Sequence, residues 1–441
     1  MRPRLPPLNR ASSYIFRIAR TNSTKATVLP KPVKEHDENY LKPIPSRYTT
    51  VRHAQHGPKQ TTWLAEDSEM GKKVLIRMIE DNPLPPADAN FVQLNIFDKL
   101  YKLAENTSHE GRHHIVELLD RFPRIKIKPE KEHDCFVYDE APYTLRSQMR
   151  VKQPVHIVKK ITKQVLLGLD FLHSELGGIH CNLRMDNIKI EMDRLPAEIR
   201  NINEPDYGRS NKQKQKLPTL PLLPEDNDLH VRIINPGTPN WTRDNSRLFE
   251  TMSNRAPEVT IGAPWGNGVD IWALGCIIIE LLRGQAAFFG LTDKQWRFTS
   301  EDVNLAKIIA NVGPFPPHLV ALGDRGHDFF NGRGILHRHP IKIDPAWFPD
   351  DHLRERVEGE EPRLLGLPLE GDAVFTDFIK GVLRIDPVER RTAAQLLRHE
   401  WLRGVGEKKR NGGGGGKESE KEGEGKVEEA EEGQDDVRRA E

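Results

Sequence analysis

The sequence predicts an α+β fold with two unequal lobes: a small, β-rich N-terminal lobe with one helix and a larger, α-helical C-terminal lobe. Two patterns support this prediction. Apolar and polar residues alternate in short runs between about residues 48 and 140, whereas apolar residues recur at helical spacing after residue 150. The length of 441 residues and the 37% hydrophobic residues suit two or three compact units with polar flanks.

Five strands and one helix are predicted in the first lobe. The helix covers residues 88–104, where apolar residues lie at helical spacing. A hairpin turn is expected over Asp67–Gly71, between the second and third strands. The strands are expected at residues 47–57, 61–67, 72–80, 113–122 and 134–140.

The second lobe is predicted to be helical at residues 154–176, 269–284, 301–311, 372–384 and 392–402. Residues 192–228 interrupt this pattern with several prolines and the polar run GRSNKQKQK. Such a composition favours a surface insertion or a disordered loop over a pair of strands.

Both ends of the chain differ in composition from the lobes. Residues 1–34 contain eight Arg or Lys and no acidic residue, so residues 1–47 are predicted to be a basic segment followed by a linker. This segment fits either a mitochondrial presequence or the basic tail of a cytoplasmic or nuclear protein. Residues 403–441 are rich in Gly, Glu and Lys and are predicted to be a disordered charged tail.

The charge and cysteine content exclude several classes of protein. A net charge of +1 gives no electrostatic reason to expect nucleic-acid binding. Cys135, Cys181 and Cys276 are far apart and odd in number, which argues against a disulfide framework or a zinc site. The apolar runs are too short to span a bilayer, so no membrane span is predicted.

Three ordered segments of the second lobe carry a recognisable pattern. The first is Ala256-Pro257-Glu258, within the phrase APEVTIGAPW, and the second is Asp270-Ile271-Trp272-Ala273-Leu274-Gly275. The third is DPVERRTA at 386–393, before a helix that ends HEWL. Together they resemble the eukaryotic protein kinases, and APEVTIGAPW resembles their SR-protein-kinase-like branch.

The resemblance covers residues 48–402 and divides them into a kinase-like N-lobe, 48–141, and a C-lobe, 142–402. It implies that Glu258 pairs with Arg390 and that Asp270 braces the catalytic loop. Buried charges of this kind are costly unless they are paired, so their retention favours an intact fold.

The catalytic loop departs from the kinase pattern at its central residue. Residues 179–190 read IHCNLRMDNIKI, where kinases have H-R-D-x-x-x-x-N. His180 and Asn187 fall at the expected spacing, and Arg184 replaces the usual lysine. The general base is replaced by Asn182, whose amide cannot accept a proton near neutral pH.

The expected ATP and magnesium positions are also altered. The resemblance places Asn235 where the magnesium-binding Asp of D-F-G stands, so Asn187 and Asn235 would be the metal ligands. Arg77 replaces the phosphate-binding lysine of V-A-I-K and has a different geometry. Its usual glutamate partner would be replaced by Gln93 or Asn95, and these two alternatives stay open. Of the glycines in the phosphate loop only Gly57 remains, beside Pro58, which has no N–H.

The strand Phe136–Glu140 resembles the hinge that holds adenine in kinases. Its contacts would come from the backbone of Asp139 and Glu140, with Tyr138 at the position that narrows the pocket. ATP and Mg²⁺ are therefore the cofactors that the resemblance implies, and the substitutions argue against both.

Three hypotheses follow from the sequence. The first is a pseudokinase with weak or absent ATP binding that acts on protein partners as a scaffold or allosteric regulator. The second is an active ATP-dependent Ser/Thr kinase with atypical catalytic residues. The third is a nucleotide-sensing switch that binds ATP without hydrolysing it.

Overall fold

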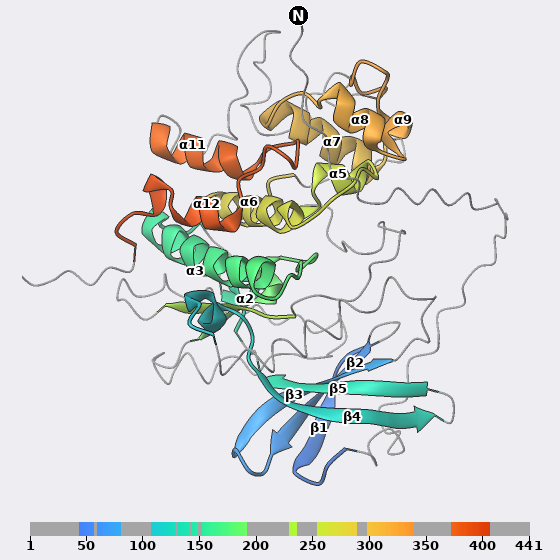
Figure 1. The fold of residues 1–441 in the computed structure, drawn as a ribbon, viewed down its shortest axis with the longest axis vertical. Coiled ribbons are helices and arrows are strands. Elements are labelled where there is room, and N and C mark those ends of the chain that lie inside the picture. Colours follow the sequence, from blue (N-terminus) through green and yellow to red (C-terminus); the bar gives the residue numbers. More distant parts are fainter. Residues whose placement is uncertain are drawn as a thin grey trace, which may run out of the picture. The chain divides into compact units, whose positions relative to one another are not determined.

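The computed structural model describes residues 44–56, 60–80, 107–128, 131–140, 143–148, 152–191, 229–235, 254–288, 298–338 and 372–405. They form an antiparallel sheet and a set of helices, which confirms the predicted α+β fold (Figure 1). Almost all of the expected N-terminal segment and of the C-terminal tail lies outside the described residues, as do the helix over 88–104 and the insertion at 192–228.

The chain divides into two compact units. The first combines Met1–Arg150 with the later segments Phe171–Pro221 and Arg232–Glu250. The second comprises Val151–Asp170, Leu222–Val231 and Thr251–Glu441.

A five-stranded sheet forms the centre of the first unit. Neighbouring strands pair antiparallel in the order β1-β2-β3-β5-β4. Side chains of the central strands form a buried core that includes Trp63 of β2 and, at alternate positions of β3, Val74, Ile76 and Met78. The strands are β1 (Tyr48–His56), β2 (Gln60–Asp67), β3 (Lys72–Glu80), β4 (Leu118–Lys128) and β5 (Lys131–Asp139).

The turn between β2 and β3 is organised by one carboxylate. The Asp67 side chain accepts hydrogen bonds from the Arg47 guanidinium at 2.8 and 2.7 Å. It also accepts the backbone N–H groups of Glu69 at 2.9 Å and Met70 at 3.1 Å. Gly71 completes the turn with a φ of 62°, in the left-handed region that glycine adopts without strain.

The fourth strand begins later along the chain than the sequence predicts. Residues 110–114 form a 3₁₀ helix, and β4 begins only at Leu118. The intervening apolar residues pair elsewhere: Ile115 forms a parallel bridge with Ile233, and Val116 N–H donates to the Ile233 carbonyl at 2.7 Å. Their apolar character reflects burial against a distant segment rather than membership of the sheet.

Two short elements in the first unit carry the residues of the catalytic loop. The 3₁₀ helix η3 (Met185–Asn187) leads directly into β6 (Ile188–Glu191). β6 pairs with β7 (His230–Ile233) in a two-stranded sheet. The short helix α2 (Leu145–Gln148) contacts both η3 and β6.

Four of the five helices predicted in the C-terminal part are present. They are α3 (Val155–Ser174), α6 (Gly268–Arg283), α7 (Ser300–Asn311) and α11 (Ala373–Val382). The helix expected over 392–402 is instead divided into α12 (Ala393–Leu397) and a 3₁₀ turn (Glu400–Leu402). The break follows from His399, whose Nδ1 accepts the Trp401 N–H at 3.1 Å and caps the second element.

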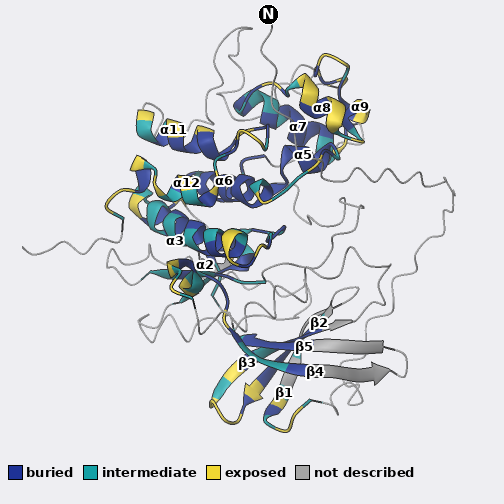
Figure 2. Ribbon diagram, viewed as in Figure 1, coloured by how far each residue is buried: buried dark blue, intermediate teal, exposed yellow. Residues whose placement is uncertain are grey.

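Helix α6 is the buried centre of the second unit (Figure 2). Gly275 lets α11 approach it, because a Cβ at this position would lie 2.6 Å from the Leu383 side chain and 2.8 Å from that of Val382. Three short helices accompany it: α5 (Pro257–Thr260), α8 (Pro317–Leu322) and α9 (Gly326–Phe329).

A buried ion pair joins α5 to the turn before α12. The Arg390 guanidinium donates to the two Glu258 carboxylate oxygens at 2.7 and 3.0 Å. Both side chains have no exposed surface. Arg390 also donates to the Gly268 carbonyl at 2.7 Å, so one side chain connects three segments of the second unit.

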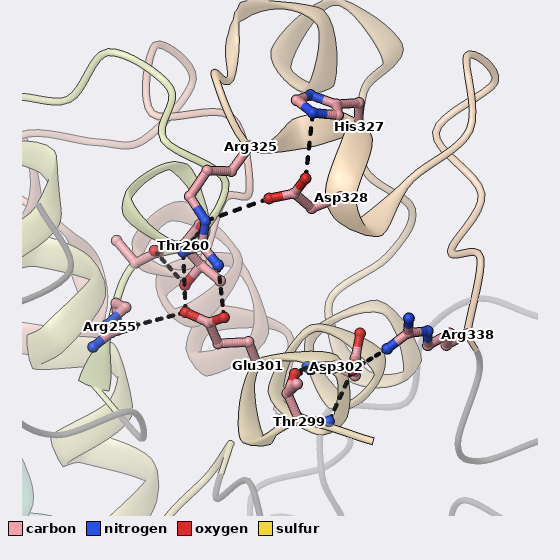
Figure 3. Close-up of polar contacts among 10 residues, drawn as sticks. Arg255, Thr260, Thr299, Glu301, Asp302, Arg325, His327, Asp328 and Arg338 are labelled. Carbon is pink, nitrogen blue, oxygen red and sulfur yellow. Dashed lines mark hydrogen bonds and ion pairs between the residues drawn. The ribbon is translucent and has the colours of Figure 1, made fainter. Parts of the chain in front are cut away.

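A carboxylate also fastens α5 to α7 and to the loop before α9 (Figure 3). Glu301 accepts from Arg325 at 3.1 and 2.7 Å and pairs with Arg255 at 3.4 Å. Arg325 in turn donates to the Thr260 carbonyl at 3.2 Å. Asp302, the neighbour of Glu301, closes a capping box with Thr299 at the start of α7.

We expect the stability contributed by Asp67 to depend on pH. Hydrogen bonds from Arg47 lower its pKa from 3.8 to about 2, so its carboxylate stabilises the fold above the unfolded pKa and loses this effect as the pH falls through the folded pKa. In calorimetry of the full chain and of Asp67→Asn, the stability difference should be constant above about pH 5 and should narrow below about pH 4. A difference that stays flat down to about pH 3 would contradict this assignment.

Removal of the buried ion pair should destabilise the second unit strongly. Arg390→Ala leaves the Glu258 carboxylate buried without its partner, and we expect a loss of about 3–5 kcal/mol in the free energy of unfolding. The matched control is Arg391→Ala, because this neighbour pairs with the exposed Asp377 and should lose at most about 1 kcal/mol. Chemical denaturation distinguishes the two, and equal losses would count against the anchoring role.

Candidate functional site

His180 fixes the start of the catalytic-loop segment. Its ring is fully buried; Nδ1 accepts the Asn182 N–H at 3.2 Å, and Nε2 lies 3.0 Å from the Ile234 carbonyl. Because Nδ1 acts as an acceptor and a carbonyl can only accept, this arrangement assigns the proton to Nε2. The ring therefore ties the loop to the residue that precedes Asn235.

A chain of hydrogen bonds joins the positions expected for phosphate binding, metal binding and the base. The Arg77 guanidinium on β3 donates to Oδ1 of Asn235. Asn235 Nδ2 donates to Oδ1 of Asn187 at 2.9 Å, and Asn187 Nδ2 donates to the backbone carbonyl of Asn182 at 2.8 Å. We name this series Arg77–Asn235–Asn187–Asn182 the amide chain.

The local backbone positions the amide chain. Ile234 N–H donates to the Asn187 carbonyl at 2.9 Å, which holds the end of β7 against η3. Asn235 then adopts a φ of 59°, in a left-handed region that asparagine tolerates better than most residues. Its side chain is thereby placed between Arg77 and Asn187.

Arg77 is a buried cation. Its residue is 6% exposed, and the guanidinium carbon lies 5.8 Å from the centre of the Tyr138 ring. Burial lowers the pKa of the guanidinium, and the neighbouring Tyr138 opposes this effect. Burial raises the pKa of the Tyr138 phenol, which therefore stays protonated at neutral pH.

The amide chain does not fit a magnesium ion. The side-chain oxygens of Asn235 and Asn187 both accept N–H groups, and both ligands are neutral, whereas Mg²⁺ is usually held through carboxylates. A guanidinium stands beside them. A divalent and a monovalent cation about 4 Å apart repel by roughly 8 kcal/mol at an effective dielectric constant of about 20. Among the described residues, no group of three or more His, Cys, Asp or Glu side chains is arranged to hold a metal either.

The position of the general base is equally unsuited to proton transfer. Asn182 is half-buried and supplies its carbonyl to the amide chain. Asp186 is the only acidic residue between His180 and Asn187 in the sequence. Its carboxylate pairs with Arg184 at 3.2 Å and Arg146 at 3.7 Å, so two guanidinium groups engage it.

The hinge segment contains an ion-pair cluster that sequence reasoning missed. Asp139 pairs with Lys72 at 2.5 Å and with Lys189 at 3.9 Å, and Lys189 is also 3.9 Å from Glu191. The Lys189 side chain is 13% exposed. The sequence does carry a signal for Lys189, because this lysine lies between the buried Ile188 and Ile190 and interrupts an apolar strand.

The remaining predicted residues contribute less to the site. Glu140 lies half-buried after β5, and Asp270 is buried in the first turn of α6. The phosphate-loop residues Gly57 and Pro58 and the two alternatives Gln93 and Asn95 lie outside the described residues. In the part of the chain that is described, no helix is long and apolar enough to cross a membrane.

Comparison with known proteins identifies the family. The "Protein kinase domain" family profile matches residues 105–402, which is more than half of the chain. The chain is 24% identical to the serine/threonine-protein kinase SRPK of Physarum polycephalum, over 82% of this chain and 87% of the relative. It is 24% identical to protein kinase dsk1 of Schizosaccharomyces pombe, over 81% of each chain. It is 28% identical to serine/threonine-protein kinase AFC1 of Arabidopsis thaliana, over 61% of this chain and 55% of the relative. The chain therefore belongs to the eukaryotic protein kinases, in their SR-protein-kinase-like branch.

Proposed function

We propose that this chain is a pseudokinase, a protein kinase domain that binds protein partners as a scaffold or allosteric regulator and has weak or absent binding of magnesium-ATP. The observation that carries this proposal is the amide chain. It links the side chains at the phosphate and metal positions to each other and to the backbone carbonyl at the base position, and it contains no carboxylate.

The magnitude of the expected losses supports inactivity. A general base typically contributes about 10²–10⁴ to the rate. Phosphoryl transfer depends even more on electrostatic stabilisation and metal positioning, which Asn235 and Asn187 supply poorly as neutral ligands. Partial combination of these losses already lowers turnover by several orders of magnitude.

The alternative is an active ATP-dependent Ser/Thr kinase with atypical catalytic residues. It is supported by the names of the relatives, two of which are called serine/threonine-protein kinases, and by the retained Asn187 and Glu258–Arg390 pair. This alternative requires a carboxylate from another segment to act as base and metal ligand. None of the described contacts of Asn182, Asn187 or Asn235 involves a carboxylate.

Phosphoryl transfer is the direct test. The full chain, incubated with labelled ATP, an Arg/Ser-rich peptide and either Mg²⁺ or Mn²⁺, should incorporate phosphate only at background level into the peptide and into itself. The triple variant Arg77→Lys, Asn182→Asp, Asn235→Asp restores the kinase pattern and is the matched comparison.

Incorporation by the native chain that Asn187→Ala abolishes would establish the active kinase and overturn the proposal. Background incorporation by the native chain, with activity gained by the triple variant, would assign the loss to these three positions. A silent triple variant beside a silent native chain would still support a pseudokinase and would place additional defects elsewhere.

The amide chain should act as a structural element of the apo fold. Asn187→Ala removes the acceptor for Asn235 and the donor to Asn182, so we expect a loss of about 1–3 kcal/mol in the free energy of unfolding. The neighbouring Asp186→Ala removes only solvent-accessible ion pairs and should lose at most about 1 kcal/mol. Urea denaturation of both variants measures the difference, and equal stability of Asn187→Ala and the native chain would be inconsistent with this role.

A further inference from the structure

Three arginines are buried among the described residues, and one of them differs from the others. Arg390 pairs with Glu258 at 2.7 Å, and Arg255 pairs with Glu301 at 3.4 Å. Arg77 pairs with no carboxylate of the described residues; its contacts there are the Asn235 amide oxygen and the Tyr138 ring. Its Nε is buried and has no hydrogen-bond partner in this part of the chain.

A buried guanidinium in this state lacks both a compensating negative charge and a hydrogen-bond acceptor for its Nε. Arginine does not lose its proton at neutral pH, so it cannot relieve burial by becoming neutral as a lysine can. Burial lowers the pKa of Arg77, which indicates how incompletely its surroundings compensate the charge. An anion that reaches the guanidinium would supply both the missing charge and an acceptor for Nε.

We propose that Arg77 forms a metal-independent oxyanion site, which binds the phosphate groups of a nucleotide as the free anion instead of as its magnesium complex. The inference deepens the proposed function, since it concerns the same site and rests on the poor fit of a metal there. It does not depend on whether phosphoryl transfer is absent.

The chemistry of the ligand follows from the donors. The planar guanidinium fork matches the oxygens of a phosphate group and favours two parallel hydrogen bonds. Magnesium coordinated to the phosphates would neutralise part of the charge that attracts Arg77 and would bring a second cation beside it. Excess Mg²⁺ is therefore expected to weaken binding, the reverse of a metal-dependent site.

The experiment is thermal unfolding of the full chain with ATP or inorganic pyrophosphate, in EDTA and in excess Mg²⁺, at constant ionic strength. We expect both anions to raise the melting temperature in EDTA and the effect to diminish in Mg²⁺. A response to both assigns recognition to phosphate groups alone, whereas a response to ATP alone assigns the ligand to a nucleotide. No stabilisation in EDTA, or stabilisation only with Mg²⁺, would overturn the proposal.

Two variants test the assignment to Arg77. Arg77→Gln removes charge-assisted hydrogen bonds and should weaken the anion effect by roughly tenfold to a hundredfold in affinity. The matched control is Arg121→Gln, because the Arg121 guanidinium lies 5.6 Å from the ring of Phe136 on the same strand, β5, that carries Tyr138. An equal loss in the control would assign the effect to general surface charge and would overturn the site.

Asn235→Asp keeps the test decisive if Arg77→Gln fails to fold. The new carboxylate would pair with Arg77 and supply the missing charge from within the protein. We therefore expect a higher melting temperature without added anion and loss of the response to ATP and pyrophosphate. An undiminished response in Asn235→Asp would contradict the proposal, whatever the phosphoryl-transfer assay shows.

Discussion

Asn187 and Asn235 are held together by a hydrogen bond between their side-chain amides, and the arrangement of the site depends on it. An amide carries both donors and an acceptor, so each asparagine can receive one hydrogen bond and pass on another. A carboxylate at position 235, as in the kinase pattern, could accept hydrogen bonds but could not donate one to Asn187. Asparagine at position 235 therefore allows the two side chains to bind each other directly without a cation between them.

The residues that stabilise the fold keep the kinase pattern, whereas several residues that would perform the chemistry depart from it. Glu258 and Arg390 form a fully buried ion pair, and removal of either partner would leave an uncompensated charge. Asparagine at positions 182 and 235 has no charge, so these positions need no charged partner for stability. Loss of the Glu258–Arg390 pair would therefore destabilise the fold, whereas asparagine at positions 182 and 235 is compatible with a stable fold.

Arg77 bears both on the stability of the fold and on the chemistry of the site. It keeps a positive charge at the phosphate position but is buried, and its hydrogen-bond acceptor is the neutral amide of Asn235. Asp139, the carboxylate at the end of β5, is engaged by Lys72 and Lys189 instead. The distribution of charge in the first unit consequently favours an anionic ligand over a metal complex.

The sequence alone determined the fold class, the turn at Asp67–Gly71, most helices and the limits of β3, because periodicity and turn chemistry are local properties. The resemblance to kinase motifs also identified Asn182, Asn235 and Arg77 as altered positions and Asn187 as a retained one. Only the tertiary structure decided that Ile115 pairs with Ile233, that Lys189 reaches Asp139 and that Arg77 donates to Asn235. The last contact joins residues 158 positions apart, and an amide can donate or accept, so its partner and direction are set by the packing of distant segments.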